Sequence, residues 1–153
     1  LRSQLLGVIY DLEAYSVSRP GQQELAETMS GGRQEEGCVV LTFEESLPSM
    51  KEYSAALDEH WRAMIHAAIQ EAAVQEGLPR FDRAFVQIEV TTPRGSSNRQ
   101  LWDTCNRAVN LIINNLKGIF FRDDDLEHMA FSVVGAWGET GRTVVRISRF
   151  LQT

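Results

Sequence analysis

The chain has 153 residues, of which 43% are hydrophobic and 24% charged, and its formal net charge at pH 7 is -6. This length predicts one domain that buries roughly 70% of its unfolded surface. No apolar run approaches the ~20 residues of a membrane span, and no charged segment precedes an apolar one at the start, so we expect a soluble, cytoplasmic protein. The first residue is Leu1 rather than Met, so we expect the natural start to lie elsewhere.

The average charge hides an asymmetry between the middle of the chain and the rest. From Arg80 to Arg122 there are seven basic and three acidic residues, a local balance of +4, so the remainder carries -10. The acidic total argues against a nucleic-acid partner, but a basic middle is typical of either a phosphate-facing surface or a solvated face. The two cysteines, Cys38 and Cys105, lack metal-ligand spacing and are too few for a disulfide framework, so we predict free thiols.

The first 36 residues are predicted to form a helical extension. Apolar residues recur at helix spacing from Leu1 to about Tyr15, and a second short helical stretch covers Gln22 to Met29. This stretch ends in Ser30–Gly32, and the polar segment Arg33–Gly37 that follows is typical of a linker. We therefore predict an extension over residues 1–36 and a domain over residues 37–153. The apolar face of the extension packs either on that domain or on a partner.

The domain is predicted to begin with a strand and a long helix. Cys38–Phe43 is a β-branched, apolar run of strand length. Ser49 with Glu52 forms a capping box, and apolar residues continue after it at helical spacing. The two histidines of this helix, His60 and His66, point to different faces, so we predict no metal pair.

A half-buried strand and a basic loop are predicted next. The segment Phe85–Thr91 alternates between the two faces of a strand. The loop over residues 92–100 carries Arg94 and Arg99 among glycine, serine and proline, and it could hold phosphate through its guanidinium groups and backbone. The apolar side of the strand is formed by Ala84, Val86, Ile88 and Val90.

The spacing predicts an amphipathic helix from Asp103 to Lys117. Because asparagine lowers helix propensity, its polar stripe is either a solvated face or a site. The core face is formed by Val109, Ile112, Ile113 and Leu116. The polar stripe is formed by Asp103, Asn106, Arg107, Asn110 and Asn114.

The last part of the chain is predicted to form a turn and two strands. Gly118 ends the helix, and Ile119–Phe121 enters the core ahead of the acid run Asp123–Asp125. The strands Met129–Val134 and Thr143–Ser148 are predicted to form a hairpin across a glycine-rich loop. The order of elements predicts an α/β (α+β) fold in which a small mixed β-sheet is packed with helices.

Two acidic points, Asp103 and the run Asp123–Asp125, are the strongest functional signal. Bunched carboxylates repel one another and disfavour folding unless a cation or a basic partner offsets them. Carboxylates that hold Mg²⁺ can activate water and stabilise the leaving oxygen of a phosphodiester. An exposed turn would explain the same acids without any ligand.

The segment Asp103-Thr-Cys-Asn106 resembles the Asp-x-Asp-Asn signature of the RusA family of Holliday junction resolvases, small phage-derived endonucleases. The run Phe120-Phe-Arg-Asp123-Asp124 is similar to the aromatic turn of that family, which ends in Asp-Asp. The order of elements from about Val39 to Phe150 also follows the succession of the family, so the resemblance covers about the last three quarters of the chain.

This resemblance implies a Mg²⁺-dependent endonuclease, with Mn²⁺ as a possible substitute, that resolves branched DNA in recombination and repair. It also implies a homodimer. By the same resemblance Asp103 and Asp124 would be catalytic metal ligands, with Asp123 adjacent. We expect DNA contacts from basic and amide side chains: Arg94, Arg99, Arg107, Asn106, Asn110 and Lys117.

The chain departs from the family pattern at two positions. Cys105 stands where the signature has its second aspartate, and a thiol is a poor ligand for the hard cation Mg²⁺. Val109 stands where a lysine is expected, so Arg107 or Lys117 would have to supply the positive charge, although arginine and lysine are not interchangeable. One of three further carboxylates could complete a divergent metal site: Glu127, Asp125 or Glu89.

Two other hypotheses stay open. A catalytically weakened or inactive module with the RusA fold would bind DNA or protein without cleaving it. An unrelated domain with solvated acids would bind neither metal nor DNA. Cleavage of branched DNA that requires a divalent metal and Asp103 would separate the three.

Overall fold

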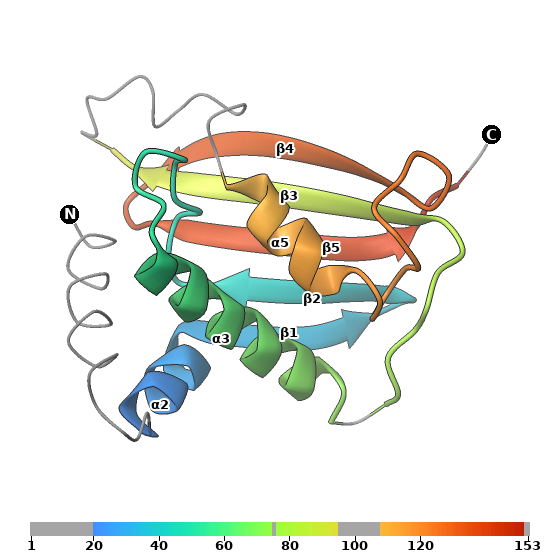
Figure 1. The fold of residues 1–153 in the computed structure, drawn as a ribbon, viewed down its shortest axis with the longest axis horizontal. Coiled ribbons are helices and arrows are strands. Elements are labelled where there is room, and N and C mark those ends of the chain that lie inside the picture. The colour runs from blue at the N-terminus through green and yellow to red at the C-terminus, as the bar shows by residue number, and fades with distance from the viewer. Residues whose placement is uncertain (1–19, 75, 95–107, 152–153) are drawn as a thin grey trace.

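The computed structural model describes residues 20–74, 76–94 and 108–151. The described strands form one five-stranded mixed sheet, and the helices pack against it (Figure 1). This is the α+β class that the sequence predicts. The elements are α2 (Pro20–Met29), β1 (Ser30–Glu35), β2 (Cys38–Phe43), α3 (Ala55–Ala72), β3 (Ala84–Pro93), α5 (Val109–Leu116), β4 (Met129–Gly138) and β5 (Arg142–Arg149).

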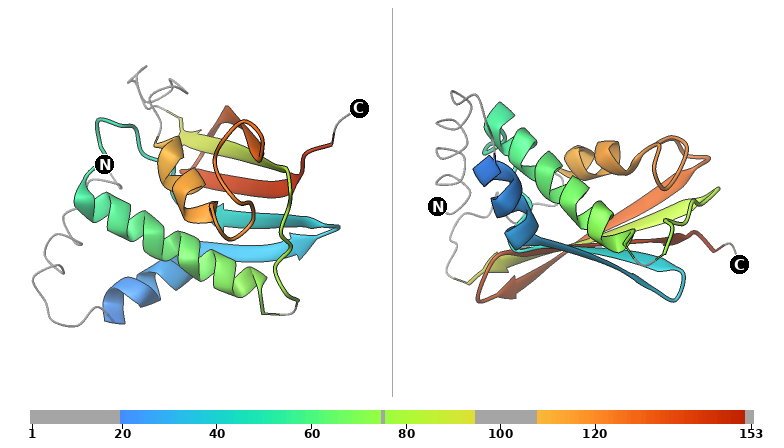
Figure 2. Two further views of the ribbon diagram at one scale, coloured as in Figure 1. Left: turned by 45° about the vertical axis from the view of Figure 1, so that its right-hand side comes forward. Right: turned by 90° about the horizontal axis from the view of Figure 1, so that it is seen from below.

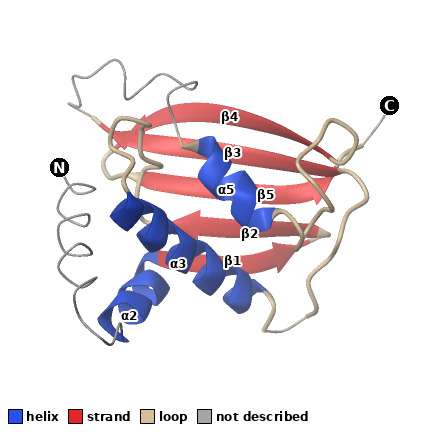
Figure 3. Ribbon diagram, viewed as in Figure 1, coloured by secondary structure: helices blue, strands red, loops and turns tan. Residues whose placement is uncertain are grey.

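The strand order across the sheet is β1-β2-β5-β3-β4. β3 and β4 are parallel, and the other neighbouring pairs are antiparallel. β5 therefore lies in the centre of the sheet, whereas β1 and β4 are its two edges (Figure 3).

The predicted hairpin of the last two strands is wrong. β4 and β5 are consecutive in the chain, but β3 lies between them and pairs with both. The physical reason is burial: Thr143, Val145 and Ile147 of β5 are fully buried, which suits a strand with neighbours on both edges. Alternation identifies a strand without naming its neighbour, so the sequence pattern is the same for a hairpin and for this connection.

All described helices lie on one side of the sheet, as Figure 2 shows. α3 packs on β1 and β2, α2 packs beside α3, and α5 also contacts α3. The alternation predicted for β3 is confirmed, since its apolar residues Ala84, Val86, Ile88 and Val90 are buried under the helices. The other face of the sheet carries no described helix.

The N-terminal region differs from its prediction. α2 confirms the second helical stretch, whereas residues 1–19 with the first predicted helix lie outside the described residues. The predicted linker is wrong, because β1 pairs in register with β2 and forms a sheet edge. Glu36 and Gly37, with φ of 45° and 80°, make the turn between the two strands. The polar residues of this segment reflect an edge strand with one solvated face.

The start of α3 also differs from its prediction. The side chain of Ser54, not Ser49, caps this helix by accepting a hydrogen bond from the backbone N–H of Leu57 at 3.1 Å. Ser49 and Glu52 do contact each other at 3.2 Å, but they close an isolated turn ahead of the helix. The Ser-x-x-Glu pattern therefore predicts the contact between these two side chains correctly, but the contact does not cap the helix.

A buried polar pair ties α3 to the chain that leaves β2. His60 Nε2 lies 2.7 Å from Glu45 Oε2, and both side chains are buried. The hydroxyl of Thr143 on β5 donates to the carbonyl oxygen of Glu45 at 2.8 Å. His66 on the same helix is exposed, so the prediction that the two histidines face different sides is confirmed.

Candidate functional site

The acid run begins directly after a turn that the core holds in place. α5 ends before Gly118, whose φ of +85° is the left-handed conformation that favours glycine. Phe120 and Phe121 are fully buried, as predicted, whereas Ile119 is exposed, so the prediction that it enters the core is wrong. The N–H of Phe81 donates to the carbonyl oxygen of Phe120 at 2.7 Å. The loop that carries the carboxylates is therefore anchored to the core where it begins.

Asp123 and Asp124 lie together near Lys117 at the carboxyl end of α5. Asp123 Oδ1 accepts a hydrogen bond from the backbone N–H of Asp124 at 2.9 Å. This bond lowers the pKa of Asp123, which keeps its side chain ionised. Asp124 Oδ1 lies 3.6 Å from Lys117 Nζ, and both side chains are partly exposed. Two anionic side chains and one cationic side chain thus share this surface.

Asp125 has a structural role. Its Oδ1 accepts hydrogen bonds from the backbone N–H groups of Glu127 and His128, each at 3.0 Å, and lies 2.6 Å from His128 Nδ1. Desolvation alone would raise the pKa of Asp125, but the hydrogen bonds from His128 and Glu127 outweigh it and lower that pKa. Asp125 therefore closes the turn that leads into β4 and is poorly placed to complete a metal site.

Glu89 is also separated from the acid run. It lies on β3 with its side chain on the face of the sheet opposite the helices, in a groove that also includes Val134 and Arg146. The acid run follows α5, which packs on the helix-covered face. Across the described part of the chain, no three His, Cys, Asp or Glu side chains form a group that could hold a metal ion.

An arginine-lined pocket adjoins the acid turn. It has a volume of about 560 Å³. Arg83 Nε donates to the carbonyl oxygen of Glu127 at 3.0 Å, and Arg80 Nη1 donates to that of Gly118 at 3.4 Å. Because backbone carbonyls orient both guanidinium groups, the remaining donors stay available for an anion. The pocket is lined by Arg80, Phe81, Asp82, Arg83, Arg122, Glu127 and His128.

These three arginines belong to the basic middle of the chain, but no sequence pattern assigns them to a site. The chain separates Arg80 and Arg83 from Arg122 by about forty positions, and the backbone bond between Phe81 and Phe120 brings them together. An apolar Phe81 between Arg80 and Arg83 is the pattern that could have predicted the pocket. A buried aromatic side chain fixes the backbone of such a segment and therefore the positions of its basic neighbours.

Other predicted site residues lie away from the acid run. Arg94 follows β3, whose opposite end adjoins the acid turn, and ten strand residues span about 33 Å. Ala108 is the N-cap of α5, which begins at Val109, and eight helical residues place it about 12 Å from the acid end. Asn110 is exposed on this helix.

Four predicted site residues lie outside the described residues, and so does the cysteine that departs from the family signature: Asp103, Arg99, Asn106, Arg107 and Cys105. The convergence of Asp103 with the acid run therefore stays a prediction. For Cys38 the free thiol is confirmed, and burial raises the pKa of that thiol.

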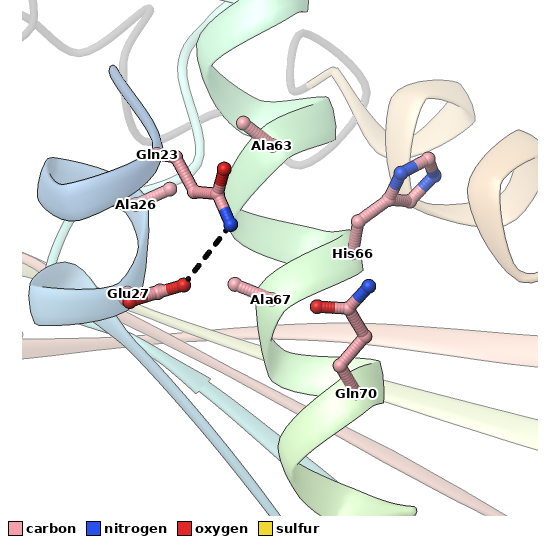
Figure 4. A pocket seen from close by; sticks show the side chains of 7 residues that line it. All are labelled: Gln23, Ala26, Glu27, Ala63, His66, Ala67 and Gln70. Carbon is pink, nitrogen blue, oxygen red and sulfur yellow. Dashed lines mark hydrogen bonds between the residues drawn. The ribbon is translucent and has the colours of Figure 1, made fainter. Parts of the chain in front are cut away.

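A second hollow, of about 360 Å³, lies between α2 and α3 (Figure 4). Gln23 Nε2 donates to Glu27 Oε1 at 3.3 Å across its rim, and His66 faces it from α3. None of the predicted catalytic or DNA-binding residues lines this hollow, so it does not support the nuclease hypothesis.

No protein-family model matches this chain, and a search of the curated proteins finds no match. None of the described helices combines the length and the apolar composition that crossing a membrane requires. The RusA-like resemblance therefore depends on the motifs and on the order of elements.

Proposed function

We propose that this protein is a divergent RusA-like endonuclease that cleaves branched DNA, such as Holliday junctions, with Mg²⁺ or Mn²⁺, and that it acts in the cytoplasm as a homodimer. The observation that carries the proposal is the placement of Asp123 and Asp124 beside a pocket lined by three arginines. Carboxylates suit a divalent cation, and guanidinium groups suit the phosphates of its substrate.

The order of elements supports the same proposal. From β2 to β5 the chain runs strand, helix, strand, helix, acid turn and two strands, which is the succession implied by the resemblance. In this proposal Asp103, Asp123 and Asp124 would hold the metal. A bound Mg²⁺ would supply an activated water and stabilise the leaving oxygen.

The arginines of the pocket would bind the DNA backbone. Arg80, Arg83 and Arg122 offer planar donors to phosphate oxygens, which gives affinity that falls with salt and does not depend on base sequence. The predicted contacts of Arg94, Arg99, Arg107, Asn106, Asn110 and Lys117 remain part of the proposal. Most of them lie toward the other end of α5 or outside the described residues.

The second candidate is a binding module with the same fold but without cleavage. Cys105 in place of the second signature aspartate favours it, and so does the structural role of Asp125, because both reduce the carboxylates available for metal. This module would bind a four-way junction equally well with Ca²⁺ or Mg²⁺ and would leave the strands intact.

A cleavage assay distinguishes the two candidates. The purified full chain is incubated with a labelled synthetic four-way junction and linear duplex of the same sequence, with Mg²⁺, Mn²⁺ or Ca²⁺. We expect nicking of the junction with Mg²⁺ or Mn²⁺ and its loss in Asp124→Asn and Asp103→Asn. Glu24→Gln, which removes a negative charge from α2, serves as the matched control and should cleave normally. Junction binding without cleavage under all conditions would favour the module.

A further inference from the structure

The edge strand β4 carries neither the charge nor the proline that often protects a sheet edge. It is ten residues long, contains no charged residue and no proline, and pairs with β3 on one side only among the described residues. Phe131 and Val134 are 53% and 57% exposed. A long, uncharged and apolar edge with unpaired backbone groups is a template for a further strand.

The composition of β4 favours an identical strand as that partner. Each copy carries a net charge of -6, so two copies repel each other on average. Met129–Gly138 is a neutral stretch in which two copies can approach without like charges meeting. Identical edges that face each other about a two-fold axis can exchange N–H and C=O bonds in the antiparallel arrangement.

We propose that β4 is the interface between two copies of this chain, which pair their β4 strands antiparallel about a two-fold axis and form one continuous sheet. The interface buries the exposed Phe131 and Val134 of each copy and satisfies the outer backbone groups of β4. It also leaves β1 as the outer edge at both ends of the joined sheet.

This pairing places opposite ends of the two copies side by side. The start of β4 adjoins the acid turn, where the N–H of Ala84 donates to the carbonyl oxygen of His128. Its far end adjoins Arg94, whose N–H donates to the carbonyl oxygen of Gly138. Antiparallel pairing therefore brings the partner's Arg94 toward the acid turn. The functional meaning of this contact rests on the proposed function, but the pairing itself does not.

The size of the interface sets the concentration at which it forms. A strand of about 33 Å on a sheet about 10 Å thick offers a footprint of roughly 330 Å² per copy. This is below the roughly 800 Å² per partner of a standard interface, so we expect a dimer that forms at micromolar concentrations and dissociates on dilution.

The first test measures molar mass by light scattering after gel filtration. At concentrations on the order of 100 µM the wild type should show twice the chain mass of 17.2 kDa. Val134→Lys should show one chain mass, because two lysines would meet across the axis. Val74→Lys makes the same change at a valine that is 78% exposed beyond α3 and should remain dimeric. A monomeric wild type, or a dimeric Val134→Lys, would overturn the proposal.

The second test does not depend on disruptive variants or on nuclease activity. In a Cys38→Ser, Cys105→Ser background, single cysteines are placed at Ser132, Val133 or Val134, close to the expected axis. At least one should form a disulfide-linked dimer on mild oxidation. Met129→Cys should not, because the two copies of residue 129 would lie about 30 Å apart. Cross-linking at residue 129, or at none of the central positions, would refute antiparallel pairing through β4.

Discussion

The two edges of the sheet are built in opposite ways. β1 is short, carries Arg33 and Glu35, and is held from behind by α3, whose carbonyl oxygen at Ala72 accepts a hydrogen bond from Gln34 Nε2 at 3.0 Å. β4 is longer, uncharged and exposed. Proteins protect edges by shortness, charge and cover. Among the described residues β1 is therefore the better protected edge, and β4 is the edge at which the proposed second copy would pair.

The same comparison predicts where the stability of the monomer resides. On the β1 side, α3 covers β1 and β2 and buries Trp61, Met64 and Ile65 against them. On the β4 side, most side chains of the strand remain partly exposed. Substitutions that separate α3 from β1 and β2 should therefore cost most, and substitutions on the outer edge of β4 should cost least.

The largest effect is expected from His60→Leu. This change leaves the carboxyl group of Glu45 buried without the partner that lies 2.7 Å away, and removing one member of a buried polar pair costs about 3–5 kcal/mol. The free energy of unfolding, measured by urea titration, should fall by that amount. His66→Leu is the matched control on the same helix and should stay within about 0.5 kcal/mol of the wild type, because its side chain is exposed.

A double variant sharpens this first prediction. Glu45→Leu with His60→Leu removes both members of the pair, so neither is left buried without the other. We expect it to recover much of the loss. If His60→Leu lost no more stability than His66→Leu, the pair would not be what fastens α3 to the end of β2.

The next largest effect is expected at Gly32, where β1 passes closest to α3. A Cβ at this position would lie 1.8 Å from the carbonyl oxygen of Ala68, so Gly32→Ala must push the strand away from the helix. We expect a loss of about 3 kcal/mol, the upper range for overpacking, measured as a fall in the urea midpoint. At Gly31 the nearest atom would be 3.8 Å away, so Gly31→Ala should be tolerated. Equal effects at both positions would contradict the close packing of this edge.

Local patterns predicted the elements that depend on local chemistry. The strand Cys38–Phe43, the buried alternation of β3 and the stop at Gly118 are all confirmed, because periodicity and a left-handed glycine act over a few residues. The neighbour of β5 and the strand β1 were missed. Both depend on pairing across the sheet. The residues of β5 that pair with β2 lie about a hundred positions further along the chain.

The candidate site shows the same division. The acid run and its rigid start were predictable, since Phe120 and Phe121 precede the aspartates directly. The arginine pocket was not, because the contact that carries Arg80 to the turn is a backbone hydrogen bond between distant segments. Asp125 was predicted to be available for metal, but its hydrogen bonds with His128 depend on a turn geometry that composition does not reveal.

A smaller effect is expected at the turn that feeds β4. The lowered pKa of Asp125 means that its carboxylate stabilises the fold above the pKa of the unfolded chain, about 3.9, and that this contribution is lost as the pH falls through the folded pKa. Asp125→Asn should therefore be less stable than the wild type at pH 6, and the difference should shrink toward pH 3. Thermal melting across this range tests the sign. Asp82→Asn, which also removes one carboxylate at an exposed position near the same turn, is the matched control.

The smallest effect on the monomer is expected from Val134→Lys, although this variant should abolish the dimer. Its side chain is more than half exposed and contributes little to the core, so the free energy of unfolding at submicromolar concentration should change by less than about 0.5 kcal/mol. Val74→Lys should behave alike under these conditions. The two variants should differ only at high concentration, where the wild type gains stability from association. A large loss in the dilute monomer would show that β4 supports its own fold, and the contrast between the two edges would then disappear.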